Sequence, residues 1–582
     1  MNYDVSHLPE LTEQPWTPVP DEGWTPSPAT AGNPHVCFLN GAWDFAIAPR
    51  DKQRGWRDLD GRWWRWDEAD QALKPHDDDQ PRGLDADFMK AEPGDATWRS
   101  IPVPGNWEQH GFSNHVFAHM SLDRDDVVGY YRRRFALPDA WGNGGRVILQ
   151  AEGIAASAEV WINEQFAGYH DGGFVPFQLD VTGLLRDGEN LIAIRVVKAD
   201  ISTVHDNAGQ WMLSGIWRDI FLFHVGEAHV RDFHVEPDFD PASREGRLHI
   251  GIDASVAEGE IEAVLLPWEA DDEPIALTRM ALDGGAATVD LATADIEPWT
   301  PETPHMYRLE CRLIVGGAIV ERVREEVGFR RFHADGERFL INGEPFLIRG
   351  VTRHEIRQGR GRSLSLADYE HEIRLMRQAN VTGVRSHPYP FDPRFIKLCA
   401  RHGIVVCSGY CLCGYNSWGN PWSMSETKTY PAHESTFDAG YRHLFQQRYW
   451  SFAPKIYARF RNCTAILAWS LSNESAISEI FYPVARFLHE REQRRFILSA
   501  GESNMIGSKF YQVAPQQQPL IEHIRRDLLT ADAEHYPERQ SVDELRQRIP
   551  LITDRPRPVF YTEAAHVFCN RDHFLLDPGI LG

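Results

Sequence analysis

The stretch N-C-T-A-I-L-A-W-S-L-S-N-E-S, residues 462–475, decides how the rest of the chain is interpreted. Residues 465–471 form an apolar run of strand length without a charge, which is typical of a parallel strand buried on both faces. The run leads into an amide and a carboxylate, Asn473 and Glu474. In an α/β barrel the carboxyl ends of the strands carry the chemistry, so both residues are candidates for a site. The alternative is that Glu474 only opens the following helix, where a carboxylate is favoured.

A second short strand pattern also ends on an acid. Residues 558–563 read P-V-F-Y-T-E, a β-rich run that ends in Glu563. Hydrolysis of a glycosidic bond needs two carboxyl groups, one to protonate the leaving oxygen and one to attack carbon or activate water. Two barrel strands can supply such a pair, so the second acid favours the catalytic interpretation of Glu474.

Length and charge limit the classes of protein to consider. At 582 residues the chain is too long for one core, so three or four domains are expected. Its 60 Lys and Arg residues against 84 Asp and Glu give a formal charge of −24, which argues against a nucleic acid or an anionic membrane as partner. The sequence shows no signal peptide at its start and no run of the roughly 20 apolar residues that span a membrane. We therefore expect a cytoplasmic protein.

The residue patterns divide the chain into four segments. Residues 1–35 are rich in Pro, Thr and Glu without periodicity and predict an extended arm. Residues 36–225 alternate apolar and polar positions between Gly, Asn and Asp turns, which predicts an antiparallel sandwich of jelly-roll type. Residues 226–334 have the length and turn spacing of an immunoglobulin-like sandwich. Residues 335–582 alternate strand and helix patterns.

The last segment predicts a (β/α)8 TIM barrel that lacks one strand. A capped helix is expected behind Ser365, with Asp368 completing the capping box, and another behind Asp392. We expect no eighth strand before residue 582, so either the chain is a shortened version of a longer protein or something else closes the gap. The expected strands are residues 346–351, 381–385, 404–407, 465–471, 496–500, 527–531 and 558–562.

Several segments resemble glycoside hydrolase family 2, in particular its large bacterial β-galactosidases. The segments are W-S-L-S-N-E-S and T-E-A-A-H-V-F-C-N around the two glutamates, G-V-T-R-H-E at residues 350–355, and residues 161–182 and 210–220 of the jelly roll. The resemblance implies a retaining exo-β-glycosidase, a β-galactosidase first, with a carbohydrate substrate and a double-displacement mechanism. It leaves open a β-glucuronidase, a β-mannosidase, an arabinofuranosidase or a non-catalytic carbohydrate-binding homologue, and it allows a homo-oligomer.

The resemblance also assigns roles to individual residues. Glu474 corresponds to the general acid/base and Glu563 to the nucleophile, which fits the chemistry because the acid must keep a proton while the nucleophile stays ionised. Asn473 is expected to hydrogen-bond a substrate hydroxyl, and Arg353 to organise the two glutamates electrostatically. The other expected pocket residues are Tyr536 beside the nucleophile, His354, His387 and His566 near the strand ends, and Asp200 and His119 from the jelly roll.

The departures from the family pattern fall in the expected pocket. Residues 385–390 read R-S-H-P-Y-P, so His387 is displaced by one position and Pro388 intrudes. His119 stands where the galactosidases present an asparagine. The acidic pair that is usual after strand three is replaced by residues 407–415, C-S-G-Y-C-L-C-G-Y. The sugar is therefore undecided, and no cofactor is certain, although the resemblance allows a magnesium or sodium ion.

Two further stretches have a chemical and a structural interpretation. Cys407, Cys411 and Cys413 suit a soft metal, but they lack the paired spacing of a zinc site, so we expect small buried thiols and no metal. Residues 50–96 form a polar, Trp-rich insertion, which we expect to be a solvated excursion from the jelly roll.

Overall fold

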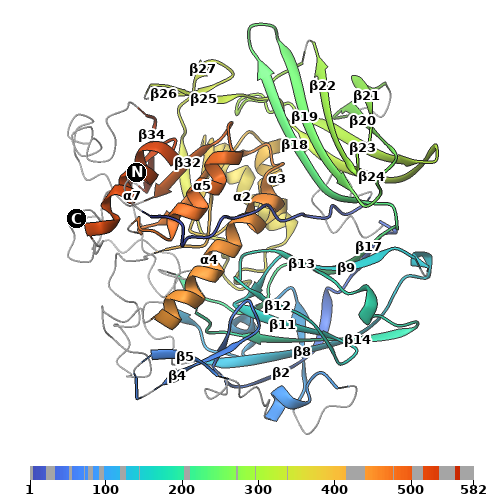
Figure 1. Cartoon of the computed structure of the whole chain (residues 1–582), viewed down its shortest axis with the longest axis vertical. Coiled ribbons are helices and arrows are strands. Elements are labelled where there is room, and N and C mark those ends of the chain that lie inside the picture. The colour runs from blue at the N-terminus through green and yellow to red at the C-terminus, as the bar shows by residue number, and fades with distance from the viewer. Residues whose placement is uncertain are drawn as a thin grey trace.

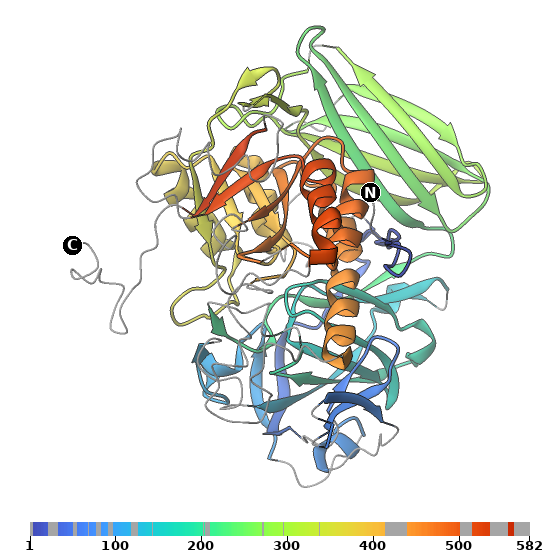
Figure 2. The ribbon, with the colours of Figure 1, turned by 60° about the vertical axis from the view of Figure 1, so that its left-hand side comes forward.

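The computed structural model combines a jelly-roll sandwich, an immunoglobulin-like sandwich and a TIM barrel (Figure 1). The barrel lies between the two sandwiches, and the long helix α4 (Ala439–Phe460) runs along its border with the jelly roll (Figure 2). None of the described helices is long and apolar enough to cross a membrane. The structure describes residues 4–20, 33–50, 55–67, 69–70, 72–76, 83–90, 97–117, 126–142, 144–201, 203, 210–269, 273–294, 296–336, 338–413, 439–475, 477–500, 515–535 and 557–563.

The jelly roll is built from two antiparallel sheets around one apolar core. Trp43, Phe45 and Tyr131 fill this core because alternate side chains of a strand point to the same face. The six-stranded sheet runs, in spatial order, β12 (Gln165–Asp171), β11 (Ser157–Ile162), β14 (Glu189–Val197), β8 (Val127–Ala136), β2 (Gly41–Pro49) and β6 (Arg99–Val103). The four-stranded sheet runs β1 (Val36–Phe38), β17 (Ile220–Val225), β9 (Arg146–Ala151) and β13 (Phe177–Asp180).

The described residues of the Trp-rich insertion are packed, which corrects the expectation of a solvated excursion. It contains a three-stranded sheet of β3 (Trp56–Arg57), β4 (Trp63–Asp67) and β5 (Ala72–His76). Trp56 and Trp63 are buried, and the ring of Trp64 lies 5.1 Å from that of His443 on α4. Indole rings make this possible because they supply a large apolar area even in a polar stretch.

The immunoglobulin-like domain also has two antiparallel sheets. Strand β18 alternates buried and accessible residues along most of its length, as the sequence pattern predicts for a strand with one face in a core. One sheet contains β18 (Val230–Asp240), β19 (Glu245–Ala254) and β22 (Ala286–Thr293). The other contains β21 (Ala276–Ala281), β20 (Glu260–Pro267), β23 (Tyr307–Val315) and β24 (Ala318–Val327).

The structure describes seven barrel strands, and all the pairs between them are parallel. The first five form one sheet, the last two pair with each other, and β34 comes near β28 on the other side. An eighth strand is absent from the described residues. The strands are β28 (Gly350–Arg353), β29 (Gly383–Ser386), β30 (Val405–Gly409), β31 (Ile466–Asn473), β32 (Phe496–Ala500), β33 (Asp532–His535) and β34 (Val559–Glu563).

Expected strand six, residues 527–531, is wrong, since β33 begins at Asp532. Helix α7 (Gln518–His523) continues as a π-helical turn through residues 524–528. Leu528 ends that turn and Leu529 follows it, both with buried side chains, and a short apolar run of this kind does not distinguish a buried helix end from a strand.

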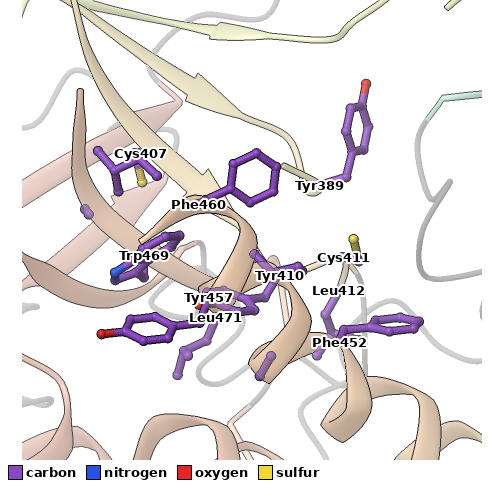
Figure 3. Close-up of a cluster of buried hydrophobic side chains, with 14 of the residues drawn as sticks. Tyr389, Cys407, Tyr410, Cys411, Leu412, Phe452, Tyr457, Phe460, Trp469 and Leu471 are labelled. Atoms are coloured by element: carbon purple, nitrogen blue, oxygen red, sulfur yellow. The ribbon is translucent and has the colours of Figure 1, made fainter. Parts of the chain in front are cut away.

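The helices that cover the barrel begin where their caps predict. In α2 (Leu366–Gln378) the Ser365 side chain accepts from the Asp368 backbone, and Asp368 in turn accepts from Ser365, which confirms the capping box. Asp392 caps α3 (Pro393–Arg401). Helix α4, together with α5 (Phe481–Arg491), covers β31. Figure 3 shows the aromatic packing, with Tyr457 and Phe460 from α4 near Trp469 from β31.

A small sheet contributes an aromatic side chain near the amino-terminal ends of the barrel strands. It consists of β25 (Phe332–Asp335), β26 (Arg338–Ile341) and β27 (Glu344–Pro345). The ring of Phe339 lies 5.0 Å from that of Phe496 and 4.4 Å from that of Phe560, near the starts of β32 and β34. Apolar packing at this end leaves the opposite, carboxyl-terminal ends of the strands as the place for a site.

Residues 4–20 contain no helix or strand and contact all three domains. The Trp16 backbone donates to Asp232 of the immunoglobulin-like domain, and the Thr17 backbone donates to Gln178 of the jelly roll. The carboxylate of Glu13 pairs with Arg461 and Arg491 of the barrel domain at 3.2 and 3.3 Å. This segment therefore joins units that lie far apart in the sequence.

Candidate active site

The candidate site lies at the carboxyl ends of the barrel strands. Strand β31 ends in Asn473, and Glu474 follows it with a positive φ of 45°, a conformation that residues other than glycine seldom adopt. The Asn473 N–H donates to Leu412 O at 2.7 Å, and the Glu474 N–H donates to Ala500 O at 2.8 Å. Two successive backbone N–H groups thus donate hydrogen bonds to segments on opposite sides of β31, which fixes the backbone positions from which both side chains extend.

The side chain of Asn473 is held from two sides. Arg385, in β29, donates from Nη2 to Asn473 Oδ1 at 2.6 Å. The Asn473 amide nitrogen donates to Cys413 Sγ at 3.2 Å and to Glu474 Oε2 at 3.4 Å. Asn473 is 0% exposed and Glu474 7% exposed. The amide and the carboxylate therefore form a buried, oriented pair beside the end of the strand.

Four of the expected residues cannot be placed in the same detail. Glu563 is the last residue of β34, where its backbone is opposite His535 of β33, as expected for an acid at a strand end. Tyr536, His566 and His119 lie outside the described residues. The expected distance between the two catalytic carboxyl groups therefore stays a prediction.

Histidines from two neighbouring strand ends come together with the jelly roll. The rings of His354, after β28, and His387, after β29, lie 4.8 Å apart. His354 Nδ1 is 3.1 Å from Oε1 of Gln210 in the jelly roll, and Arg362 donates to the same oxygen at 2.8 Å. The structure thus places a jelly-roll residue in contact with the ends of the barrel strands.

The described partners of Arg353 lie in the helix layer of the barrel, and its expected role toward the two glutamates stays a prediction. Its guanidinium pairs with Glu372 of α2 at 2.5 Å and lies over the ring of Phe395 of α3, 4.1 Å from its centroid. A nearby carboxylate, Glu355, lies at 4.0 Å. Because Arg353 is directed into the helix layer, its contacts among the described residues are with these groups and not with Glu474.

Asp200 lies in a buried ion-pair cluster at the border between the jelly roll and α4. Its carboxylate accepts from Ser157 Oγ at 2.7 Å and from Arg448 Nη2 at 2.9 Å. Arg448 also pairs with Asp171 and reaches the Tyr169 hydroxyl. Burial raises the pKa of Asp200, against the opposing effect of the hydrogen bonds from Ser157 and the Ile201 backbone. These contacts connect the jelly roll to the barrel domain, independently of any contact between Asp200 and a sugar.

Cys407, in β30, and Cys411 and Cys413, which follow it, are buried, as expected. Burial raises the pKa of Cys407 to about 11, although Arg385 lowers it in part. Cys413 contacts Asn473, and Figure 3 shows Cys411 near Leu412 and Phe452, among apolar side chains. No group of His, Cys, Asp or Glu side chains with metal-ligand spacing occurs in the described part of the chain.

Two residues of the site were missed in the sequence. Arg385 is a charged residue inside the buried strand β29, and a charge in such a strand was the signal that could have singled it out, since buried charges are rare without a partner. Gln210 precedes a short strand of the jelly roll, and nothing local distinguishes it. The strand ends thus present amide, imidazole and carboxylate groups, which are the kinds of side chain that hydrogen-bond a hydroxyl-bearing ligand.

Three models of one family match the chain in consecutive order. The family 2 glycosyl hydrolase sugar-binding domain matches residues 37–226, the Glycosyl hydrolases family 2 model matches residues 228–330, and the family 2 TIM barrel domain matches residues 332–571. Together they account for most of the chain.

Relatives and solved structures agree with these matches. A β-galactosidase of Halalkalibacterium halodurans is 26% identical over 416 residues, 69% of this chain and 40% of the relative. One of Vibrio vulnificus is 30% identical over 418 residues, 68% of this chain and 39% of the relative. The chain thus spans about two fifths of the length of these relatives.

A solved β-glucuronidase of Ruminococcus gnavus has a TM-score of 0.68 at 18% identity and covers 92% of this chain and 83% of its own. At this identity the likeness shows the fold alone. The three consecutive family models, the three-domain fold and the strand-end position of Glu474 lead to the same assignment. The chain belongs to glycoside hydrolase family 2.

Proposed function

We propose that the chain is a retaining exo-β-glycosidase that removes terminal β-linked sugars, with β-galactosides as the first substrates to test. The observation that carries the proposal is the buried pair of Asn473 and Glu474 at the end of β31. Glu563 ends β34, a second strand of the barrel domain. Two acids at strand ends of one barrel are what a two-carboxylate mechanism requires.

In this mechanism Glu563 attacks the anomeric carbon while Glu474 donates a proton to the leaving oxygen. A covalent glycosyl-enzyme results, and water then hydrolyses it after giving a proton to Glu474. For this double displacement the two carboxyl groups must lie about 5–5.5 Å apart. The positive φ and the hydrogen bond to Ala500 support the role of Glu474, because they hold the acid in one position.

The jelly roll forms one wall of the pocket in this proposal. Gln210 bridges the wall to the barrel through His354, whose ring in turn lies beside His387. Both histidines can then meet sugar hydroxyls. Asp200 supports the wall by pairing with Arg448, so its replacement should weaken substrate binding through the position of the wall.

The choice of sugar rests on weaker support than the reaction. The matching relatives named above are β-galactosidases, but this chain spans about two fifths of their length. His387 and Pro388 depart from the family pattern at the end of β29. A substrate panel should therefore include aryl β-galactoside, β-glucuronide, β-mannoside and arabinofuranoside.

The test separates the acid from the nucleophile. Glu563→Ala should abolish turnover of every substrate, and azide should restore it with an inverted product. Glu474→Ala should retain the first step on an aryl glycoside with a good leaving group far better than on a disaccharide, because such a group hardly needs protonation. Azide should then give the product with retained configuration, since it attacks the intermediate from the face that Glu474 serves.

A glutamate outside the site provides the control. Glu490 lies on α5 and pairs with Arg486 in an exposed i, i+4 pair, so Glu490→Ala should leave turnover unchanged. Product stereochemistry is read by proton NMR. Exchanged stereochemistry between the two site variants would reverse the assignment, and wild type that hydrolyses none of the glycosides would favour a carbohydrate-binding protein without catalysis.

A further inference from the structure

The thiol of Cys413 reaches the side chain that adjoins the proposed acid. Cys413 is 1% exposed and forms a parallel β-bridge with Asn473, just beyond the end of β30. Its sulfur accepts from the Asn473 amide nitrogen at 3.2 Å. The backbone next to it is fixed as well, since Leu412 O accepts from the Asn473 N–H at 2.7 Å. The main chain therefore fixes the position of the thiol relative to the amide.

Arg385 determines which end of the Asn473 amide can face the thiol. A guanidinium only donates, so the oxygen of the amide must be the atom that lies 2.6 Å from Arg385 Nη2. The NH2 group is then directed the other way, toward Cys413 Sγ and Glu474 Oε2. Turning the amide over would place donor against donor at Arg385 and would direct the amide oxygen, instead of an N–H, toward the sulfur.

A thiol suits this position for two reasons. Sulfur is a weak acceptor, so it can hold one N–H of the amide while the second N–H remains available to a stronger acceptor. A thiol also ionises far less readily than a carboxyl group, and a carboxylate at this place would bring a second negative charge next to Glu474.

We propose that Cys413 is a positioning residue for the proposed reaction: its sulfur accepts one N–H of Asn473, so that the other N–H, which makes a long 3.4 Å contact with Glu474 Oε2, is free to turn to the sugar hydroxyl beside the scissile bond when substrate binds. The inference rests on the proposed function. We assign this hydroxyl to C2, because hydrogen bonds to the 2-hydroxyl strengthen in the transition state of glycoside hydrolysis. Cys413 itself does not touch the substrate and acts through the amide.

Three substitutions test the role. Cys413→Val keeps the volume of the side chain but has no hydrogen-bond acceptor, and Cys413→Ala removes both the volume and the acceptor. Cys413→Ser keeps a hydrogen-bond acceptor. The control is Cys463→Ser, because Cys463 is also buried but precedes β31 at its other end. Each variant is assayed as the full chain on the best aryl glycoside of the wild type and on the 2-deoxy analogue of that glycoside.

We expect Cys413→Val and Cys413→Ala to lower kcat on the 2-hydroxy substrate about 5- to 10-fold, which corresponds to one misplaced hydrogen bond. On the 2-deoxy substrate the loss should stay below about 2-fold. KM should change little, because the bond strengthens in the transition state. Cys413→Ser should recover most of the lost rate. In an enzyme that already carries Asn473→Ala, Cys413→Val and Cys413→Ala should cause no further loss of kcat.

The outcomes separate this inference from the proposed function. Equal losses on the two substrates would show that the thiol only supports the fold, and so would an additional loss in the Asn473→Ala background. An active Cys413→Val enzyme with unchanged kcat would refute the positioning role alone. Wild type that turns over no glycoside would refute the proposed function and the inference with it. If Cys413→Ala does not fold, the near-isosteric Val and Ser variants still decide.

Discussion

Replacing Arg218 by methionine should loosen the contact between the jelly roll and the barrel. The guanidinium of Arg218 is 1% exposed, and the carboxylate of Glu355, which follows β28, is 0% exposed. Their ion pair measures 2.6 Å, and Arg218 also donates to Pro390 O at 3.0 Å. Arg218→Met keeps much of the aliphatic volume and leaves the buried carboxylate with Arg353, at 4.0 Å, as its nearest described cation.

The expected cost follows from the burial of both partners. Breaking a buried pair by removing one side costs about 3–5 kcal/mol, because a charge remains in a place that water does not reach. The Tyr369 hydroxyl still donates to Glu355, so we expect about 3 kcal/mol. Arg218→Met/Glu355→Leu should lose less than the sum of the single losses, by about 2 kcal/mol, because neither charge is stranded.

Urea unfolding at pH 7 measures the stability, and kcat and KM report on the site. KM should rise, because Glu355 directly follows His354, whose ring contacts Gln210 and His387. The matched control is Arg231→Ala, which breaks the exposed pair of Arg231 with Asp253 and should cost less than about 1 kcal/mol. A loss below about 1 kcal/mol for Arg218→Met, or strict additivity in the double variant, would contradict the reasoning.

Three further outcomes are expected. Burial lowers the pKa of Lys455 to about 8, below the 10.5 of an exposed lysine. The charge of Lys455 therefore lowers the free energy of unfolding by its full amount below pH 8, and by less as the pH rises toward 10.5. Lys455→Met should therefore stabilise the protein by about 2–3 kcal/mol at pH 7 and by less at pH 9.5 in urea unfolding, and a gain that grows with pH would contradict this. Ser365→Ala removes the cap of α2 and should cost about 1 kcal/mol, whereas Ser365→Asp, which keeps a capping oxygen, should cost less. Asp200→Asn should lower the melting temperature along with the activity, because Arg448 loses a charged partner, and a normal melting temperature would favour a role limited to the sugar.

Most of the fold could be predicted because its strands have local signatures. The apolar runs that became β31 and β32 have no competing pattern, and the second was predicted at its observed bounds, Phe496–Ala500. Predictions failed where local pattern and long-range packing disagree. Trp56 and Trp63 lie in a polar stretch, yet they are buried, and the neighbouring Trp64 has its ring 5.1 Å from that of His443 on α4.

The sequence predicted which residues of the site stand at strand ends, but not which side chains they contact. Glu474 follows a run that must be buried, so its place at the end of β31 follows from the sequence. The direction of the Arg353 side chain does not follow from the sequence. Its partner Glu372 belongs to α2, and the position of that helix depends on the packing of the whole helix layer. Cys413 likewise needs the pairing of β30 with β31 before its contact with Asn473 exists.

The segment at residues 4–20 has a consequence for the order of folding. Glu13 meets Arg461 at a separation of 448 positions, so this contact closes a loop that contains both sandwiches and half of the barrel. The entropy of closing so long a loop is recovered only once the intervening domains are compact. During synthesis the segment emerges before the three domains, but its binding surface is completed only after them. Its deletion should therefore leave each domain able to fold and slow only the final assembly of the three.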